Sequence, residues 1–124
     1  DNVLMLGDSV TGLIDFYFSC TDIRAYDLAV THSAWCFSQD GATWFPERGA
    51  ALGAGYAATF GLSDAERAAF PILCRGAALR FLLTRAFDWI NTPADALVTR
   101  KDPLAYLQRL DFYAASSPEE LLGA

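Results

Sequence analysis

Residues 1–15 read DNVLMLGDSVTGLID. Within this stretch two short apolar runs, residues 3–6 and 10–14, are separated by a Gly-Asp-Ser sequence whose members tolerate the tight backbone angles of a turn. This pattern predicts a β-hairpin. Because the two ends of a hairpin lie together, Asn2 and Asp15 are expected to bring two oxygen-bearing side chains to one point.

The rest of the sequence has the apolar periodicity and the capping residues of helices. Helix starts are expected at Asp22, at Pro46, at the capping box Ser63-Asp64-Ala65-Glu66, at Asp102-Pro103 and at Ser117-Pro118. The first helix is expected to carry apolar residues as far as Phe37. The third is expected to be kinked or restarted by Pro71 before Asn91-Thr92-Pro93 ends it. A mainly helical chain behind an N-terminal hairpin is therefore predicted.

The bulk composition restricts the kinds of partner. A length of 124 residues fits one domain with a single core. Apolar residues make up 53% of the sequence and charged residues 19%, so part of the apolar surface is expected to pack against a partner. A net charge of −6 without a basic stripe argues against nucleic acid as that partner. No apolar run approaches the roughly 18 residues of a membrane span, so no membrane partner is expected.

The cysteines bear on the cellular compartment. Cys20, Cys36 and Cys74 are odd in number and form no C-x-x-C pair, which favours reduced thiols in a protein core over a disulfide framework or a zinc site. The first residues also lack the basic and apolar regions of a secretory signal. A cytoplasmic protein is expected.

The pair at the open end of the hairpin could take part in holding a cation. Magnesium prefers about six oxygen ligands and keeps several waters, so one amide and one carboxylate would hold it only together with the phosphates of a nucleotide. Taken by themselves, however, Asn2 and Asp15 are equally well explained as a terminal polar residue and a loop carboxylate.

Several motifs resemble a known group of enzymes. Three motifs resemble, in order and spacing, those of the aminoglycoside phosphotransferase and choline kinase superfamily. They are Asp1-Asn2-Val3-Leu4, Gly12-Leu13-Ile14-Asp15-Phe16 and Tyr26-Asp27-Leu28-Ala29. Further segments resemble bacterial homoserine kinases of the phosphotransferase-like type. They are Ile14-Asp15-Phe16-Tyr17-Phe18, residues 28–32 and 77–85, Asn91-Thr92-Pro93 and Lys101-Asp102-Pro103-Leu104. The resemblance covers nearly the whole chain.

The resemblance implies an α+β protein-kinase-like fold, in which residues 1–124 form the mainly α C-terminal lobe with its N-terminal β-hairpin. The implied reaction transfers the γ-phosphoryl group of ATP to L-homoserine in threonine biosynthesis, with Mg²⁺ bound. The resemblance also places the catalytic base, in a His-x-Asp motif, and the strand-rich N-terminal lobe upstream of Asp1. A chain that begins inside a catalytic loop is expected to be inactive alone.

The resemblance also implies roles for individual residues. Asn2 matches the catalytic-loop asparagine that coordinates magnesium, and Asp15 matches the aspartate that bridges the metal to the nucleotide phosphates. Asp27 matches an aspartate that braces the catalytic loop through backbone hydrogen bonds. From its position alone, Asp27 could equally be a carboxylate on a helix surface.

The acceptor site is expected on the long third helix. Arg80, Thr84, Asp88 and Asn91 recur at intervals of four, four and three, and so form one polar stripe. Arg80 would pair with the carboxylate of an amino-acid substrate, while Asp88 or Asp22 would receive its ammonium group. An ordinary solvated helix face would show the same stripe.

Other polar and aromatic residues are expected to be structural. His32, the sole histidine, is expected to be a helix residue with a local hydrogen bond. Trp35, Trp44 and Trp89 are expected to pack, although they could wall a choline-like cation pocket. The rival functions are therefore a kinase for choline, an aminoglycoside or methylthioribose, and a non-catalytic helical binding module.

Overall fold

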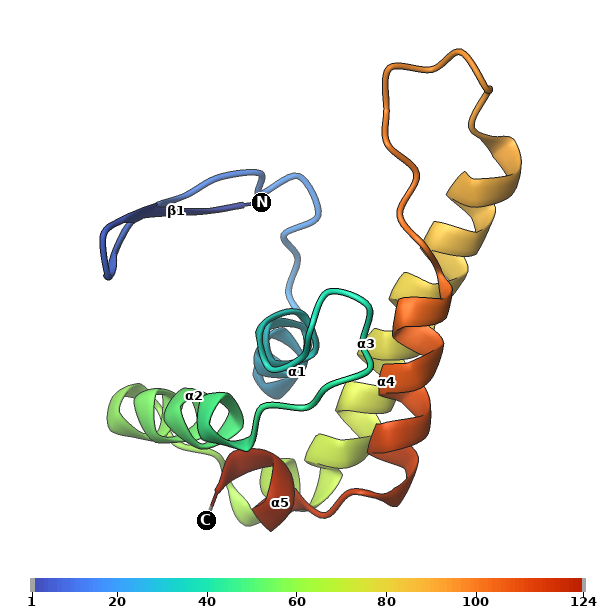
Figure 1. Cartoon of the computed structure of the whole chain (residues 1–124). Coiled ribbons are helices and arrows are strands. Elements are labelled where there is room, and N and C mark those ends of the chain that lie inside the picture. Colours follow the sequence, from blue (N-terminus) through green and yellow to red (C-terminus); the bar gives the residue numbers. More distant parts are fainter. Residues whose placement is uncertain (1, 124) are drawn as a thin grey trace.

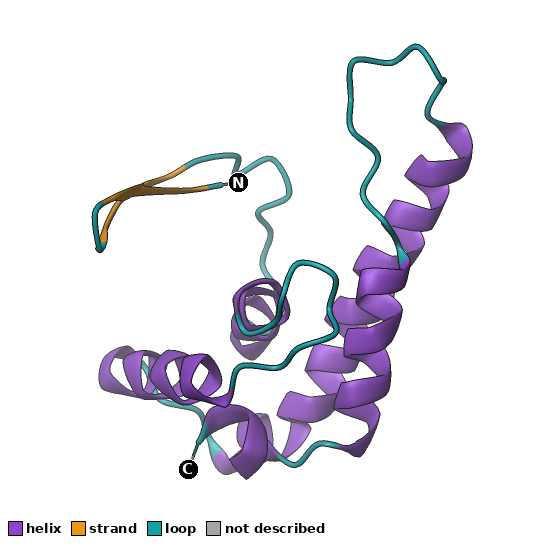
Figure 2. Cartoon of the chain, in the orientation of Figure 1, coloured by secondary structure: helices purple, strands orange, loops and turns teal. Residues whose placement is uncertain are grey.

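The computed structural model describes residues 2–123. Two short strands are followed by helices of very different lengths (Figure 1). The elements are β1 (Val3–Leu6), β2 (Ser9–Leu13), α1 (Arg24–Trp35), α2 (Pro46–Thr59), α3 (Asp64–Asn91), α4 (Leu104–Ala115) and α5 (Pro118–Leu122). The helical content and the N-terminal hairpin agree with the fold class predicted from the sequence (Figure 2).

The hairpin is antiparallel and pairs Val3 with Leu13, with an irregularity in register after Leu4. Its turn contains Gly7 at a φ of 60°, a backbone angle that glycine adopts without a steric penalty. The hairpin lies apart from the helices in Figure 1. Its apolar side chains are correspondingly exposed, by 76% at Leu6 and 61% at Val10.

The start and the end of α1 both differ from the prediction. Ile23, not Asp22, is the N-cap, because Ile23 is the extended residue that precedes the first helical turn. Asp22 instead accepts a hydrogen bond from the Ile23 amide, 2.7 Å away. The helix ends at Trp35, and Phe37 lies beyond it in an isolated antiparallel bridge with Trp44.

The longest helix, α3, begins at the predicted capping box. The Ser63 side chain accepts from the Glu66 amide, while the Glu66 carboxylate accepts from the Ser63 amide. The helix then runs for 28 residues with Pro71 inside it, so it is not restarted there. None of the helices described in residues 2–123 is long and apolar enough to cross a membrane.

The last two helices begin close to their predicted starts. The N-cap of α4 is Pro103 rather than Asp102, yet the Asp102 carboxylate still accepts from the Leu104 amide at 2.8 Å. Ser117 caps α5 as predicted, because its hydroxyl accepts from the Glu120 amide.

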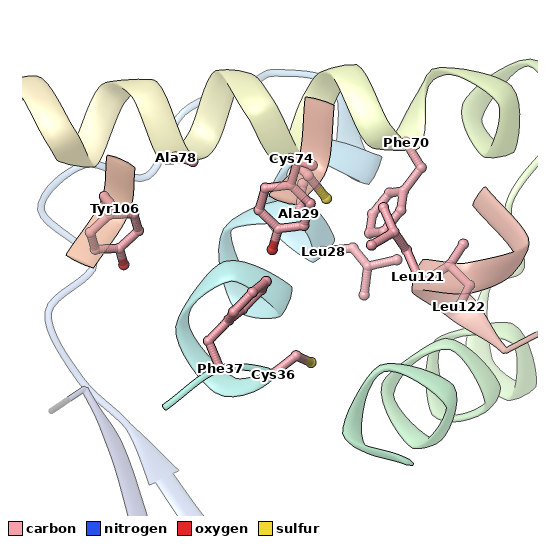
Figure 3. Packing of buried hydrophobic residues seen from close by; sticks show 11 residues of the cluster. Leu28, Ala29, Cys36, Phe37, Phe70, Cys74, Ala78, Tyr106, Leu121 and Leu122 are labelled. Atoms are coloured by element: carbon pink, nitrogen blue, oxygen red, sulfur yellow. The ribbon is translucent and has the colours of Figure 1, made fainter. Parts of the chain in front are cut away.

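The core lies where α1, α3, α4 and α5 meet (Figure 3). Its fully buried side chains include Phe70 of α3, Tyr113 of α4 and Leu121 of α5. α3 packs mainly against α4 and α1, while α2 packs against α5. The hairpin contributes no side chain to this core cluster.

The cysteines divide into two kinds. Cys36 and Cys74 are buried, as predicted, and burial raises the pKa of Cys36 to about 11. The prediction was wrong for Cys20, which is exposed because it lies in the connection between the hairpin and α1 rather than in a helix of the core.

Candidate functional site

The two predicted metal ligands lie side by side at the open end of the hairpin. The Asn2 Nδ2 donates a hydrogen bond to Asp15 Oδ2 at 3.4 Å, and the Ile14 amide donates to the Asn2 carbonyl at 3.0 Å. Both side chains are exposed. The antiparallel register, which pairs Val3 with Leu13, is what brings residues 2 and 15 together.

Asp15 has an unusual backbone conformation. Its φ is 66°, which makes it the one non-glycine residue with a positive φ in the described range 2–123. Such a left-handed conformation costs roughly 1–3 kcal/mol, although aspartate tolerates it better than most residues. Strain of this kind is concentrated at functional sites, so the conformation singles out Asp15 among the carboxylates of the chain.

The oxygen atoms of Asn2 and Asp15 suit a hard cation, but the two side chains offer only a few ligands. Asn2 uses its amide nitrogen toward Asp15, so the amide oxygen and one carboxylate oxygen are left for a ligand. Within residues 2–123 no cluster of three or more His, Cys, Asp and Glu side chains could hold a metal ion. The pair therefore suits magnesium only where other oxygens, such as phosphate oxygens, complete the coordination.

The segment that follows Asp15 contacts the helical body at one of the predicted acceptor residues. The Arg80 guanidinium carbon lies 6.0 Å from the centre of the Phe18 ring and 5.3 Å from that of Phe81. Phe18 is three positions beyond Asp15, so the segment that carries this predicted metal ligand also reaches α3. Reasoning from sequence missed this contact, although the aromatic run after Asp15 was a signal for it.

The other predicted acceptor residues are exposed and not brought together. Thr84 donates from its hydroxyl to the Arg80 carbonyl at 2.9 Å, an ordinary helix contact. Asp88 lies about 12 Å along the helix from Arg80 at 1.5 Å per residue. Among the described residues no hydrogen bond or ion pair joins Arg80 to Asp88 or to Asp22.

Asp27 lies on the exposed side of the first turn of α1. Its backbone carbonyl accepts from the Thr31 hydroxyl at 3.0 Å. The neighbouring Leu28 and Ala29 are buried, so the helix is fixed at this point while the carboxylate remains accessible. The bracing role of Asp27 remains a prediction.

His32 is structural, as predicted, but its hydrogen bonds are not local. Nε2 faces the Leu121 carbonyl at 3.1 Å, and Nδ1 faces the Tyr113 hydroxyl at 2.8 Å. Because a carbonyl can only accept, Nε2 carries the proton, and Nδ1 accepts from Tyr113. Burial lowers the pKa of His32 to about 4, so the ring is neutral at pH 7.

The tryptophans do not form one cation pocket. Trp44 is partly buried against the core cluster and stacks on His32 with ring centres 5.0 Å apart. Trp35 and Trp89 are about half exposed, and Trp89 lies under the Arg100 guanidinium at 5.3 Å. Packing, the expected use, is the one seen for Trp44.

Two hollows in the described part of the chain lie away from the Asn2–Asp15 pair. A cavity of about 140 Å³ between α2 and α5 is lined by residues that include Tyr56, Arg67 and Leu122. A more open groove of about 450 Å³ runs between α3 and α4 past Arg75 and Asp111. Neither hollow is lined by a predicted site residue.

Comparison with known proteins identifies the class. The profile of the phosphotransferase enzyme family matches residues 1–69, more than half of the chain, and the chain belongs to this family. It is 62% identical over 117 residues to the homoserine kinase of Gluconobacter oxydans (strain 621H), covering 94% of this chain and 37% of that protein. It is 58% identical over 121 residues to the homoserine kinase of Zymomonas mobilis, covering 98% of this chain and 38% of that protein. The chain thus spans little more than a third of the length of these relatives.

Proposed function

We propose that residues 1–124 are the C-terminal helical lobe of an ATP-dependent homoserine kinase, which converts ATP and L-homoserine to ADP and O-phospho-L-homoserine. The observation that carries the proposal is the 62% and 58% identity to two homoserine kinases over nearly the whole chain. The reaction belongs to threonine biosynthesis, and we place the enzyme in the cytoplasm, where ATP is supplied.

Asn2 and Asp15 are the proposed ligands of Mg²⁺. They would contribute one amide oxygen and one carboxylate oxygen, and the nucleotide phosphates would supply others. When bound, the ion neutralises charge on the transferring phosphoryl group. The hydrogen bond between the two side chains supports this role because it holds both at one point before any ligand arrives.

Arg80 is the proposed anchor for the carboxylate of L-homoserine, with Thr84 beside it and Asp88 or Asp22 as the partner of the ammonium group. Arg80 is supported most directly, because its guanidinium reaches the segment that follows Asp15. No hydrogen bond or ion pair among the described residues joins Arg80 to Asp88 or Asp22, so a role for either needs the acceptor to link it to Arg80.

The remaining part of the complete protein is proposed to supply the strand-rich N-terminal lobe and the catalytic base in a His-x-Asp motif. Asp27 would brace the loop that carries this base. The exposed apolar side chains of the hairpin, such as Leu6 and Val10, support a partner surface there, because exposed apolar groups of this size favour burial. The isolated residues 1–124 are expected to be inactive.

The test is ADP release by the complete protein with Mg²⁺ and ATP, comparing L-homoserine with choline, methylthioribose and an aminoglycoside. The phosphorylated product is identified by mass spectrometry. Stimulation by L-homoserine alone supports the proposal. Stimulation by another acceptor keeps Asn2 and Asp15 in their roles but overturns the substrate, and no ADP release with any acceptor favours a non-catalytic binding module.

A further inference from the structure

The Arg80 guanidinium is held by aromatic rings and has no ionic partner. It lies over Phe81 from its own helix and over Phe18 from the segment after the hairpin, at 5.3 and 6.0 Å. Both distances are within the range of a cation–π interaction. No described residue forms an ion pair or a side-chain hydrogen bond with this guanidinium. Its N–H groups are therefore available while its position is restricted.

Phe18 is a large aromatic residue that is exposed and yet contacts Arg80. The residue is 77% exposed, so burial in the core does not explain its aromatic side chain. The Ser19 amide donates to the Phe16 carbonyl at 3.0 Å and closes a turn that contains Tyr17 and Phe18. The ring contacts of Phe18 are the neighbouring Tyr17, at 5.2 Å between centres, and Arg80.

We propose that Phe18 is a positioning residue for acceptor recognition. Its ring holds the Arg80 guanidinium so that the N–H groups in the guanidinium plane can receive a carboxylate through paired hydrogen bonds. An aromatic face interacts with the delocalised cation and leaves the in-plane donors free, which is the geometry that bidentate recognition needs. The inference rests on the proposed function, because it assumes an acceptor that bears a carboxylate.

Phe18 also links the proposed metal site at Asp15 to the proposed acceptor site at Arg80. Asp15, the proposed metal ligand, and Phe18 lie on one short segment, and α3 carries Arg80. A segment placed against α3 through Phe18 sets Arg80 and Asp15 in a fixed relation. The acceptor carboxylate is then anchored relative to the site where the phosphoryl group is held, which favours a reactive orientation.

Steady-state kinetics of the complete enzyme tests the inference. Phe18→Leu keeps an apolar side chain but removes the ring, and it is expected to raise the KM for L-homoserine about twofold to fivefold, the range of one exposed cation–π contact. The KM for MgATP and kcat should change less than twofold. Phe18→Tyr, which retains a ring, should restore the wild-type KM. Phe16→Leu is the matched control, since it makes the same change on the same segment at an exposed residue whose ring has no contact with Arg80 or Phe18 among the described residues.

Arg80→Ala provides the second arm. If Phe18 acts through Arg80, the Phe18→Leu change has no further effect on the homoserine KM in the Arg80→Ala background. The inference is overturned if Phe18→Leu leaves that KM unchanged while Arg80→Ala raises it, a result that keeps the proposed function. It is equally overturned if Phe18→Leu raises the KM values for homoserine and MgATP together, because Phe18 would then only support the segment. Absence of ADP release with L-homoserine by the wild-type enzyme would instead sink the proposed function.

Discussion

Asn2 donates a hydrogen bond from Nδ2 to Oδ2 of Asp15 across the open end of the hairpin, over 3.4 Å. The two residues stand thirteen positions apart in the sequence, and the β1–β2 register alone brings them into contact. Asp15 adopts its left-handed conformation at the same point. The oxygen atoms of the pair are thus presented by local structure that is independent of the helical core.

Asp15→Ala in the complete protein is expected to lower kcat for ADP formation at least about 10²-fold, since a charge-neutralising metal site contributes several kcal/mol to the transition state. The fold should be retained because Asp15 is exposed. The measurement is ADP release as a function of Mg²⁺ concentration. Asp8→Ala, a change to another exposed carboxylate in the same hairpin, is the control and should remain active. Equal activity of the two variants would contradict the assignment.

Acid should destabilise the fold through His32. The pKa of His32 is about 4 in the folded state and about 6.5 in the unfolded state, so the unfolded chain binds more protons between these values. Stability from the neutral ring is complete above pH 6.5 and declines as the pH falls toward 4, by roughly 3 kcal/mol in all. Urea unfolding at a series of pH values measures this slope.

His32→Gln is the variant that isolates the histidine. Glutamine retains hydrogen-bonding groups but does not titrate in this range, so the variant should be less stable at pH 7 and show a smaller loss between pH 6.5 and 4. The same slope in both proteins would assign the acid sensitivity to other groups. Tyr113→Phe, which leaves Nδ1 without its donor, should be destabilised by about 1–3 kcal/mol at pH 7.

Arg109 is buried with its hydrogen bonds incompletely satisfied. Its Nη2 donates to the Ser38 carbonyl at 2.9 Å, and its guanidinium lies 4.3 Å from the Tyr106 ring centre. Its Nε and Nη1 are buried without a partner, and burial lowers the pKa of the guanidinium. Arg109→Ala should destabilise by about 2–4 kcal/mol because it leaves a cavity. Arg109→Met should remain within about 1 kcal/mol of wild type, because it fills the space without a buried charge. If denaturant unfolding shows the same loss of stability for both variants, the hydrogen bond from Arg109 to the Ser38 carbonyl, and not the filling of space, is the main contribution of this side chain.

Alkylation should distinguish the cysteines. Cys20 is exposed, whereas Cys36 and Cys74 are buried with raised pKa values. Iodoacetamide applied to the native protein should therefore modify Cys20 first, since only the thiolate reacts. Peptide mapping by mass spectrometry reads the result, and the unfolded protein, in which all three should react, is the control. Modification of Cys36 at the rate of Cys20 would show that the core around Cys36 opens readily.

Features with local causes could be predicted from the sequence. The Ser63–Glu66 capping box and the Ser117 cap depend on residues three positions apart, and both occur. The hairpin was predicted from its turn and its two apolar runs, and the contact between Asn2 and Asp15 follows from it. The start of α1 was misplaced by one residue because Asp22 and Ile23 compete for the same position, and a local pattern does not separate them.

Features that depend on distant residues could not be predicted. His32 was expected to bond locally, but its partners are 81 and 89 positions away. The Phe18 contact with Arg80 depends likewise on how the segment after the hairpin is placed against α3. Single-sequence patterns report neighbours along one helix or strand, and they carry no information about which two faces meet.

The bond from His32 to the Leu121 carbonyl also has a consequence for folding order. His32 lies in α1, near the start of the chain, and its Nε2–H finds its acceptor only when the final short helix α5 is in place. The two residues, His32 and Leu121, are 89 positions apart. Contacts of such long range are slow to form and delay the cooperative step of folding. Without α5 in place, the His32 Nε2–H has no acceptor and the side chains of Leu121 and Leu122 are missing from the core cluster.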